Sequence, residues 1–468
     1  MRKPAGAERV EPMPSQYERL KALAKQGGRP LKSMYVLSGS NDPFMVDMPH
    51  RQEAAEWFAR FWRQFATEDS RLHIRRIHYR LISSAAVIPR PNGEPYENTE
   101  ACWDSLVNAG RDARYLGLIP RGAIVDRRNP EPMIYITEET LTAAVIEASS
   151  GWLQALNLDD LPEPKLWLPA GAVEPPVIPQ RYHVEIWCEK STVNDVLMAL
   201  GQANGVNIVT GVGEMSLTRV EELIERIRTI DRPVRIIYVS DFDPAGIGMP
   251  VSVARKIEYD IRDEREDHDI QLRWVVLTYD QCVQYRLPRT PLKETERRAG
   301  KFEERFGEGA TELDALEAIR PGELRRILQR EIDRYRDRGL ARRVGKVVKK
   351  AERDVEAIQR RIYERHADVI EQIKADHADL LTNIAELRER IADLQSEFEE
   401  RAQPVFDAVE ADLTAELPSA DNYDWPRPKD GDEEDNPLYD SSRDYFEQLD
   451  RYREHQGSPK MQASGCTT

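Results

Sequence analysis

The sequence is poor in cysteine and lacks any long apolar run. Its four cysteines are Cys102, Cys188, Cys282 and Cys466, and no two of them stand at the Cys-x-x-Cys spacing of zinc sites. Neither a disulfide framework nor a zinc site is predicted, and a reducing cytoplasm is expected. No run of about 18 apolar residues could span a bilayer, and no apolar secretion segment opens the chain. We therefore expect a soluble intracellular protein with no membrane partner.

The sequence also lacks a net positive charge. Its 67 Lys and Arg residues are outnumbered by 83 Asp and Glu residues, which gives a formal net charge of -16. Because phosphate binding is driven by Lys and Arg, this sum argues against a nucleic-acid partner. The distribution is uneven, however: acid is concentrated near the C-terminus, as in 430–435, and Arg is concentrated in 71–80 and 111–128. A basic surface beside an acidic tail is compatible with this pattern.

The first third of the chain contains few strong periodic patterns. Residues 1–44 are rich in Pro, Gly, Ser and charge, and they predict an irregular arm. Residues 45–160 then show three amphipathic helices followed by two short strands, which is the order of a winged-helix domain. The helices are expected at 50–66, 72–82 and 99–114, and the strands at 118–125 and 133–136.

The middle of the chain alternates between strand and helix patterns. Six prolines in 161–181 predict a linker between domains, because proline cannot continue a helix or a central strand. Beyond it, short apolar runs alternate with helices of about ten or more residues, which predicts an α/β fold with a parallel, doubly wound sheet within 182–343. The strands are expected at 182–188, 206–210, 234–240 and 272–277, with helices at 192–203, 217–228 and 247–261 and a helical extension at 322–338.

A long helix resembling a coiled coil is predicted over 344–403. Its apolar residues Ile358, Val369 and Leu380 recur every eleven positions, which indicates a continuous apolar stripe. We expect this stripe to associate with a second copy or a partner protein, since it would otherwise remain exposed. Pro404 is expected to interrupt the helix, and the acidic tail 404–468 is expected to be largely disordered.

Three acidic residues directly follow predicted strands of the sheet, at the edge where parallel sheets bind ligands. Glu189 follows the first strand, and Asp241 and Asp243 follow the third. Because side chains alternate along an extended segment, Asp241 and Asp243 point to the same side about 6 to 7 Å apart, and Phe242 points away. Carboxylate oxygens are the ligands that Mg²⁺ prefers. An isolated Asp-x-Asp would indicate a helix cap and a turn, but the glutamate at the matching place favours a Mg²⁺ site.

The two segments that carry these acids resemble the Toprim domain of topoisomerases, primases and some nucleases. They read Val-Glu-Ile-Trp-Cys-Glu-Lys at 184–190 and Val-Ser-Asp-Phe-Asp-Pro-Ala-Gly at 239–246. Within this group they are most similar to the A subunit of type IIB topoisomerases and to the related meiotic double-strand-break protein, which place a winged-helix domain before the Toprim domain. The resemblance covers roughly 45–340. It implies a homodimer that cleaves DNA with Mg²⁺, for which Mn²⁺ can substitute.

In that family the nucleophile is a tyrosine in an Arg-x-x-(Tyr or Phe)-Tyr motif. The run 75–79 matches this motif at Arg75 and Tyr79 and departs from it at His78. The resemblance implies that Tyr79 attacks a DNA phosphodiester and forms a 5′-phosphotyrosyl link beside the metal of the second protomer. A tyrosine hydroxyl has a pKa near 10 and needs a cation or base such as Arg75 to become reactive. The alternative is that Tyr79 simply packs in the domain core.

Two other functions remain open on the sequence. A Toprim nuclease of the plasmid or phage defence type would use metal-activated water, and a DNA-binding protein without cleavage would use the coiled coil. No glycine-rich nucleotide signature is present, so an ATPase would have to be a separate partner, bound through the long helix. A nucleoid-associated location is expected in each case.

Several further residues are weaker candidates. Lys190 could contact phosphate, although a lysine at a helix start is usually only solvated. Glu312 and Asp314 could add a metal ligand, although acids at a helix start are common. His183 and His268 lack neighbours at metal-ligand spacing and are expected to serve the fold.

Overall fold

The structure, a computed structural model, divides the chain into two units. It describes residues 16–65, 71–136, 141–154, 164–230, 232–264, 268–294, 296–384, 391–431 and 436–457. The first unit contains the described residues of Met1–Thr137, Arg181–Tyr335 and Gly431–Thr468, and the second contains those of Glu138–Gln180 and Arg336–Asp430. Each unit is built from segments far apart in the sequence, so the expected linear succession of domains is wrong.

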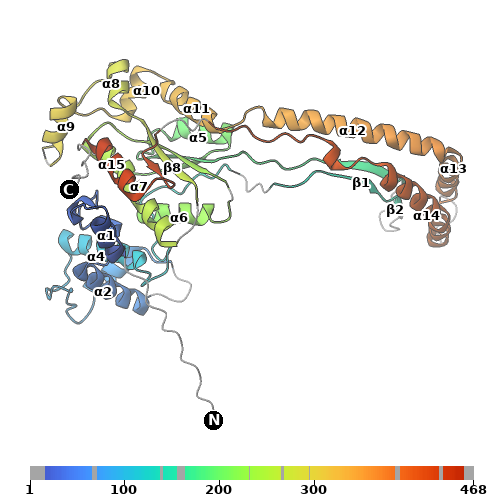
Figure 1. Cartoon of the computed structure of the whole chain (residues 1–468). Coiled ribbons are helices and arrows are strands. Elements are labelled where there is room, and N and C mark those ends of the chain that lie inside the picture. Colours follow the sequence, from blue (N-terminus) through green and yellow to red (C-terminus); the bar gives the residue numbers. More distant parts are fainter. Residues whose placement is uncertain are drawn as a thin grey trace, which may run out of the picture. The chain divides into compact units, whose positions relative to one another are not determined.

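Three helices near the start of the first unit form where the sequence predicts them (Figure 1). The Thr99 side chain accepts a hydrogen bond from the Cys102 amide, and the His73 ring accepts one from the Arg75 amide, so two of the helices are capped. Their apolar faces share a core around Phe58. The helices are α2 (Pro49–Phe65), α3 (Ile74–Ile82) and α4 (Glu100–Tyr115).

The two strands expected after these helices do not pair with each other in the described part of the chain. Ile124 instead forms a parallel bridge with Leu72, and Met133 forms an antiparallel bridge with Ile208 of the central sheet. The expected winged-helix hairpin is therefore wrong here. The physical reason is that a short apolar run specifies burial but not its partner, and each segment finds a partner elsewhere in the unit.

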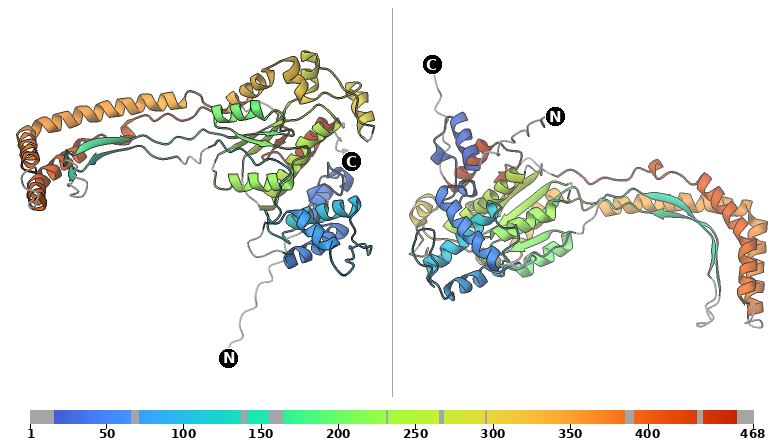
Figure 2. Two further views of the ribbon diagram at one scale, coloured as in Figure 1. Left: turned by 180° about the vertical axis from the view of Figure 1, so that it is seen from behind. Right: turned by 90° about the horizontal axis from the view of Figure 1, so that it is seen from below.

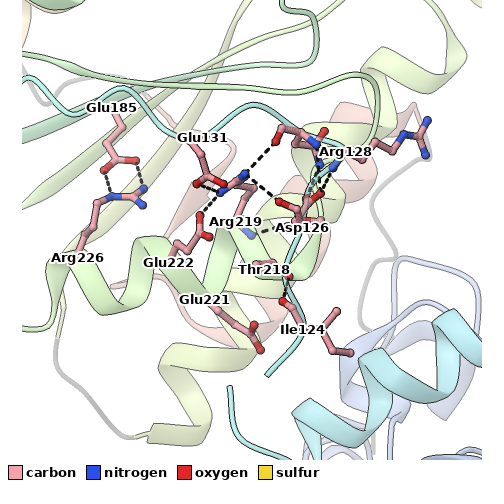
Figure 3. Close-up of polar contacts among 12 residues, drawn as sticks. Ile124, Asp126, Arg128, Glu131, Glu185, Thr218, Arg219, Glu221, Glu222 and Arg226 are labelled. Atoms are coloured by element: carbon pink, nitrogen blue, oxygen red, sulfur yellow. Dashed lines mark hydrogen bonds and ion pairs between the residues drawn. The ribbon is translucent and has the colours of Figure 1, made fainter. Parts of the chain in front are cut away.

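Hydrogen bonds and an ion pair hold the segment between Ile124 and Met133 against helix α6 (Leu217–Ile227), as Figure 3 shows. The buried Arg219 guanidinium donates to the Asn129 carbonyl at 2.9 Å and pairs with Glu131 at 3.0 Å. The Ser216 hydroxyl donates to Asp126 at 2.5 Å. These contacts replace the ladder that a hairpin would have supplied.

A five-stranded sheet forms the centre of the first unit, in the order β6-β5-β7-β8-β9. Its first four strands are parallel and β9 is antiparallel. Every residue of β5 and β7 is buried, as in strands covered on both faces. The predicted α/β architecture with a parallel sheet is confirmed. The strands are β5 (His183–Cys188), β6 (Asn207–Thr210), β7 (Val234–Val239), β8 (Ile270–Val276) and β9 (Tyr439–Asp440).

Helices pack on both faces of this sheet. On one face Ile236 of β7 lies in a core with Val251 of α7, and on the other Ile237 lies in a core with Leu197 of α5. The two neighbouring isoleucines point to opposite faces because side chains alternate along a strand. The remaining helices of this region are α5 (Asn194–Asn204), α7 (Pro244–Glu264), α8 (Tyr279–Tyr285), α9 (Ala299–Phe306), α10 (Leu313–Ile319) and α11 (Glu323–Tyr335).

Both ends of the chain contribute to the core of the first unit. Leu20 and Phe44 from the N-terminal part and Leu449 and Tyr452 from the C-terminal part are buried in the same cluster as α7. The predicted irregular arm and disordered tail are therefore wrong for the described residues, because a few scattered apolar side chains suffice when one core gathers them. The elements are α1 (Gln16–Gln26), η1 (Leu31–Ser33), η2 (Pro43–Met45), η4 (Ala420–Asn422, second unit) and α15 (Tyr445–Gln456).

A buried arginine of α7 contacts residues from both the N-terminal and the C-terminal part of the chain. The Arg255 guanidinium donates to Asp42 at 2.9 Å, to Glu258 at 2.8 Å and to the Tyr445 hydroxyl at 3.2 Å. It also lies 4.2 Å from the centre of the Phe44 ring. Arg255, Asp42 and Glu258 are fully buried, so the Asp42 charge depends on Arg255 for compensation, whereas Glu258 also pairs with Arg262 at 3.1 Å.

We expect Arg255→Met to lower the free energy of unfolding by about 3 to 5 kcal/mol, because it leaves the buried Asp42 carboxylate without its cation. Urea unfolding followed by circular dichroism measures this loss. The control is Lys21→Met, which breaks an exposed ion pair with Glu18 and should cost less than about 1 kcal/mol. Equal effects of the two changes would contradict the structural role of Arg255.

The second unit contains a two-part antiparallel ribbon where a linker was expected. Strands β1 and β4 pair in register, as do β2 and β3, whose Trp152 and Trp167 lie opposite each other. The linker prediction is wrong because Pro169 and Pro175 stand between and after these strands and leave their interiors free to pair. The strands are β1 (Val145–Ser149), β2 (Trp152–Gln154), β3 (Lys165–Trp167) and β4 (Ala170–Glu174).

The predicted single long helix is divided into α12 (Leu340–Arg365), α13 (Ala367–Ile384) and α14 (Ile391–Glu416). Helix α14 packs back on the other two and continues through Pro404, which was expected to interrupt it. Val409 of α14 covers Ile362 and Ile370 in one apolar cluster. Of the predicted stripe, Leu380 is buried and Ile358 packs against this cluster, whereas Val369 is exposed. The chain itself thus covers most of the stripe, which weakens the argument for a partner on that face. None of the helices in the described ranges is long and apolar enough to cross a membrane.

Candidate metal site and basic cleft

Two of the predicted acids meet at the carboxyl edge of the sheet. Glu189 directly follows β5, and Asp241 lies two residues beyond the end of β7. Because these strands are parallel neighbours in register, their C-terminal ends lie side by side. The Asp241 amide donates to Glu189 Oε2 at 3.3 Å, and the Leu313 amide donates to Asp241 Oδ1 at 2.7 Å. Both carboxylates are buried.

Asp243 lies on the same loop and is partly exposed. Its Oδ1 accepts a hydrogen bond from the Gly246 amide at 2.5 Å, so it also caps the start of α7. Phe242 between the two aspartates is buried in the opposite direction, against Phe302. A Cβ atom at Gly246 would lie 2.2 Å from the carbonyl oxygen of Asp241, so this tight loop requires glycine there.

A lysine lies at the centre of this acidic group. Lys190 Nζ is 2.8 Å from Asp241 Oδ2, 3.2 Å from Glu312 and 3.5 Å from Asp314. Glu312 and Asp314 stand at the start of α10 and thus belong to the same group as the acids of β5 and β7. The helix-start interpretation of Glu312 and Asp314 is thus confirmed, and both residues also pair with Lys190. The interpretation of Lys190 as merely solvated is wrong, because it pairs with Asp241.

The acidic group carries more negative charge than Lys190 offsets. Burial, followed by the charges of Asp241 and Asp243, raises the pKa of Glu189 to about 8. Burial also raises the pKa of Asp241, although Lys190 and the Leu313 amide oppose that shift. Closely spaced, partly desolvated carboxylates of this kind are stabilised by a divalent cation with oxygen ligands.

The donor chemistry fits Mg²⁺, but the side chains are not yet arranged as its ligands. In the part of the chain that the structure describes, no three acidic, imidazole or thiol side chains are grouped so that they could hold a metal ion. Asp241 is engaged by Lys190, and Asp243 by the Gly246 amide. Binding by Glu189, Asp241 and Asp243 together would therefore require Lys190 to release Asp241.

We expect the metal-free protein to lose stability as the pH rises from 4.5 towards about 8. The first value is the ordinary pKa of a glutamate, and the second is the raised pKa of Glu189 in the folded chain. The folded state binds this proton more tightly than the unfolded state, so the contribution is complete below 4.5 and is lost as the pH passes 8. Urea unfolding at several pH values measures the slope. Glu189→Gln should flatten it, and an unchanged slope in that variant would exclude Glu189 as the cause.

Tyr79 lies on the outer side of α3, and 59% of its surface is exposed. Packing in the domain core, the alternative interpretation of this residue, is therefore wrong. The neighbouring His78 is the buried residue: its ring contacts the Tyr96 hydroxyl at 2.8 Å. His78, the residue that departs from the Arg-x-x-(Tyr or Phe)-Tyr motif, is thus buried in the core of the three helices. Arg75 and Arg76 are exposed on the same helix as Tyr79.

A cleft of about 760 Å³ is lined by α3, α4, the start of α6, and α7. Lys256 in its lining donates to the Met215 carbonyl at 2.7 Å. Burial lowers the pKa of Lys256, although Glu214, 3.3 Å from its Nζ, opposes that shift. Burial also lowers the pKa of His73, with help from Arg75 and Arg127. The lining contains more cations than acids: its acids are Asp126 and Glu214, and its cations are Arg75, Arg111, Arg114, Arg127, Arg128 and Lys256.

The cleft and the acidic group share a loop. The Gly213 amide donates to the Glu189 carbonyl at 2.9 Å, and Val212 forms a bridge with Lys190. The next residue, Glu214, lines the cleft. Gly213 has a φ of 108°, a backbone conformation that favours glycine. The turn at Gly213 therefore brings the loop that lines the cleft next to Glu189 and Lys190. Sequence reasoning missed the cleft because its walls come from six separated parts of the sequence.

Neither a scan of protein-family models nor a search of curated proteins finds a match to this chain. Its function is therefore argued from the chemistry of these residues.

Proposed function

We propose that this chain is a Mg²⁺-dependent enzyme that cleaves the phosphodiester backbone of DNA. The observation that carries the proposal is an acidic group at the carboxyl edge of a parallel sheet, joined by one loop to a basic cleft. Glu189, Asp241 and Asp243 would hold the metal, with Mn²⁺ as a substitute. The bound metal would stabilise the negative charge that develops on the phosphate during cleavage.

The surrounding cations would bind and orient the DNA. Arg75, Arg127 and Arg128 are exposed at the cleft, and no carboxylate among the described residues lies within ion-pair distance of them. Unpaired guanidinium groups on a chain with a net charge of -16 favour a phosphate ligand. Lys190, once released from Asp241, would lie beside the same phosphate, with Glu312 and Asp314 limiting how far it moves.

Tyr79 is the proposed nucleophile. Its oxygen would form a bond to the phosphorus, the bond from phosphorus to the 3′ oxygen would break, and the hydroxyl proton would pass to a base or solvent. An exposed hydroxyl beside Arg75 and Arg76 supports this role. Tyr79 is not among the residues that line the cleft of its own chain. We therefore place it at the acidic group of a second copy in a homodimer, as the Toprim resemblance implies.

A nuclease that uses water is the second candidate. In this case Asp241 and Asp243 would hold the metal, and Glu189, whose pKa burial raises to about 8 in the metal-free chain, would act as the general base for the attacking water. In such an enzyme Tyr79 would have no chemical role.

Incubation of the protein with supercoiled plasmid and Mg²⁺ or Mn²⁺ tests both candidates. The reaction is stopped with denaturing detergent and analysed with and without protease. Cut DNA that migrates normally only after protease treatment supports the tyrosine mechanism, and cut DNA that needs no protease supports the hydrolase. Absence of any metal-dependent cutting would overturn the proposed function.

A further inference from the structure

Helix α12 of the second unit carries a row of exposed cations on one face. Their spacing of four, three, one and three residues confines them to about 100° of the helix circumference and about 16 Å of its length. We call this row the α12 basic face. Its residues are Arg342, Lys346, Lys349, Lys350 and Arg353.

The opposite face of α12 is held by the ribbon of the same unit, as Figure 2 shows. Ala351 and Val355 are buried, and a Cβ atom at Gly171 of β4 would lie 2.5 Å from the Val355 side chain. The Gly171 amide also donates to Gln359 Oε1 at 3.1 Å. Because this face is fixed, the α12 basic face is directed to solvent and cannot turn inward.

These cations are not neutralised by acids among the described residues. Lys350 lies over the Tyr423 ring at 5.5 Å, and the Arg353 guanidinium donates to the Lys349 carbonyl. Further along α12 the arrangement differs: Arg361 and Arg365 both pair with Glu416 of α14. In a chain with a net charge of -16, the absence of any acid from 341–351 is a marked local bias, although the exposed Glu352, Asp354 and Glu356 flank the C-terminal end of the row.

Repulsion among the cations of the α12 basic face also makes helix α12 less stable. Like charges four residues apart face each other and are destabilising. Three such pairs occur here, namely 342 with 346, 346 with 350, and 349 with 353. A face that serves only to be solvated would be expected to alternate charges of opposite sign, as these positions do not.

We propose that the α12 basic face binds the phosphate backbone of duplex DNA without reading its sequence. Each strand of duplex DNA presents one negative charge per about 3.4 Å of the helix axis, so a row about 16 Å long can meet four or five phosphates of one strand. Insertion into a membrane is disfavoured, because a membrane-surface helix needs its apolar face and that of α12 is occupied by β4. This contact goes beyond the proposed cleavage and does not depend on it.

The test is the salt dependence of DNA binding by the full chain without divalent metal, measured by fluorescence anisotropy with a short duplex. Changing Arg342, Lys346, Lys349 and Arg353 to Gln removes four cations. The slope of log K against log salt should become shallower by about 3 to 4, since each phosphate contact contributes about 0.9. Gln forms helix well, so folding should be retained.

The matched control changes Arg361, Arg365, Lys374 and Arg401 to Gln, which removes the same charge from cations that are already paired. It should leave the slope unchanged, and so should Arg342→Lys with Arg353→Lys. Equal slopes for the two fourfold variants would overturn the proposal, as would unchanged DNA binding with a loss of binding to anionic lipid vesicles. Asp241→Asn leaves the α12 basic face unchanged, so this variant should keep the salt dependence of DNA binding even though it loses cleavage. Failure of the proposed cleavage and failure of the proposed DNA contact can therefore be told apart.

Discussion

Asp241→Asn is expected to reduce Mg²⁺-dependent plasmid cleavage by about a thousandfold or more while the chain stays folded. The change removes one negative charge from the metal-binding group, and loss of several kcal/mol of charge stabilisation corresponds to this factor in rate. Asn retains an oxygen that can accept the hydrogen bond from the Leu313 amide. The loop should therefore keep its shape. Cleavage is measured on supercoiled plasmid, and folding by urea unfolding.

The matched control is Asp195→Asn. Asp195 is an exposed acid in the first turn of α5, which follows β5 at the same edge of the sheet. Its change alters the net charge by the same amount but should leave cleavage within about twofold, the scatter expected for a surface substitution. A double variant with Asn at Asp241 and Asp243 that cleaves as fast as the unchanged protein would rule out this group as the catalytic site.

The central sheet could be predicted because its signals are local. The runs that form β5 and β7 are buried on both faces, and the helices between them begin and end close to the expected residues. Once those strands are neighbours, the positions of Glu189 and Asp241 follow from the rule that parallel strands end at one edge. This part of the candidate site therefore required no knowledge of distant contacts.

The errors share a physical cause, which is that periodicity shows which face is buried but not what covers it. The apolar stripe of α12 and α13 was predicted correctly for Ile358 and Leu380, yet these residues pack in clusters with α14 and not with a partner. Met133 was expected to pair with the strand before it, and it pairs with Ile208 instead. Nothing in either segment distinguishes these partners.

The same cause explains what was underestimated at the site. Glu312 and Asp314 lie 122 residues from the lysine and threonine that they contact, so no spacing rule links them. The one usable signal was an Asp-x-Asp-like pair of acids at the start of a short helix, which is common in proteins. The basic cleft has the same character, since its cations are individually unremarkable and gain meaning only from their grouping.

Tyr79→Phe is expected to remove both cleavage and any covalent adduct with DNA. It deletes one oxygen from a side chain that is mostly exposed, so the free energy of unfolding should change by less than about 1 kcal/mol. Tyr279→Phe is the control, because Tyr279 is another partly exposed tyrosine of the same unit and has no proposed role. If the Tyr79→Phe protein binds DNA and still cuts it, water is the nucleophile and the hydrolase is correct.

Mixing two inactive variants then determines which copy supplies the tyrosine. A mixed dimer of Tyr79→Phe and Asp241→Asn chains has one intact Tyr79 and one intact acidic group, and these lie on different chains. If the tyrosine acts across the dimer, they form one complete site, and cleavage of one strand should return as nicked plasmid. If both groups act within one chain, no complete site forms and the mixture stays inactive. Each variant on its own is inactive in either case. Nicking that needs protease for release from the protein would therefore establish at once the nucleophile, its copy and the dimer.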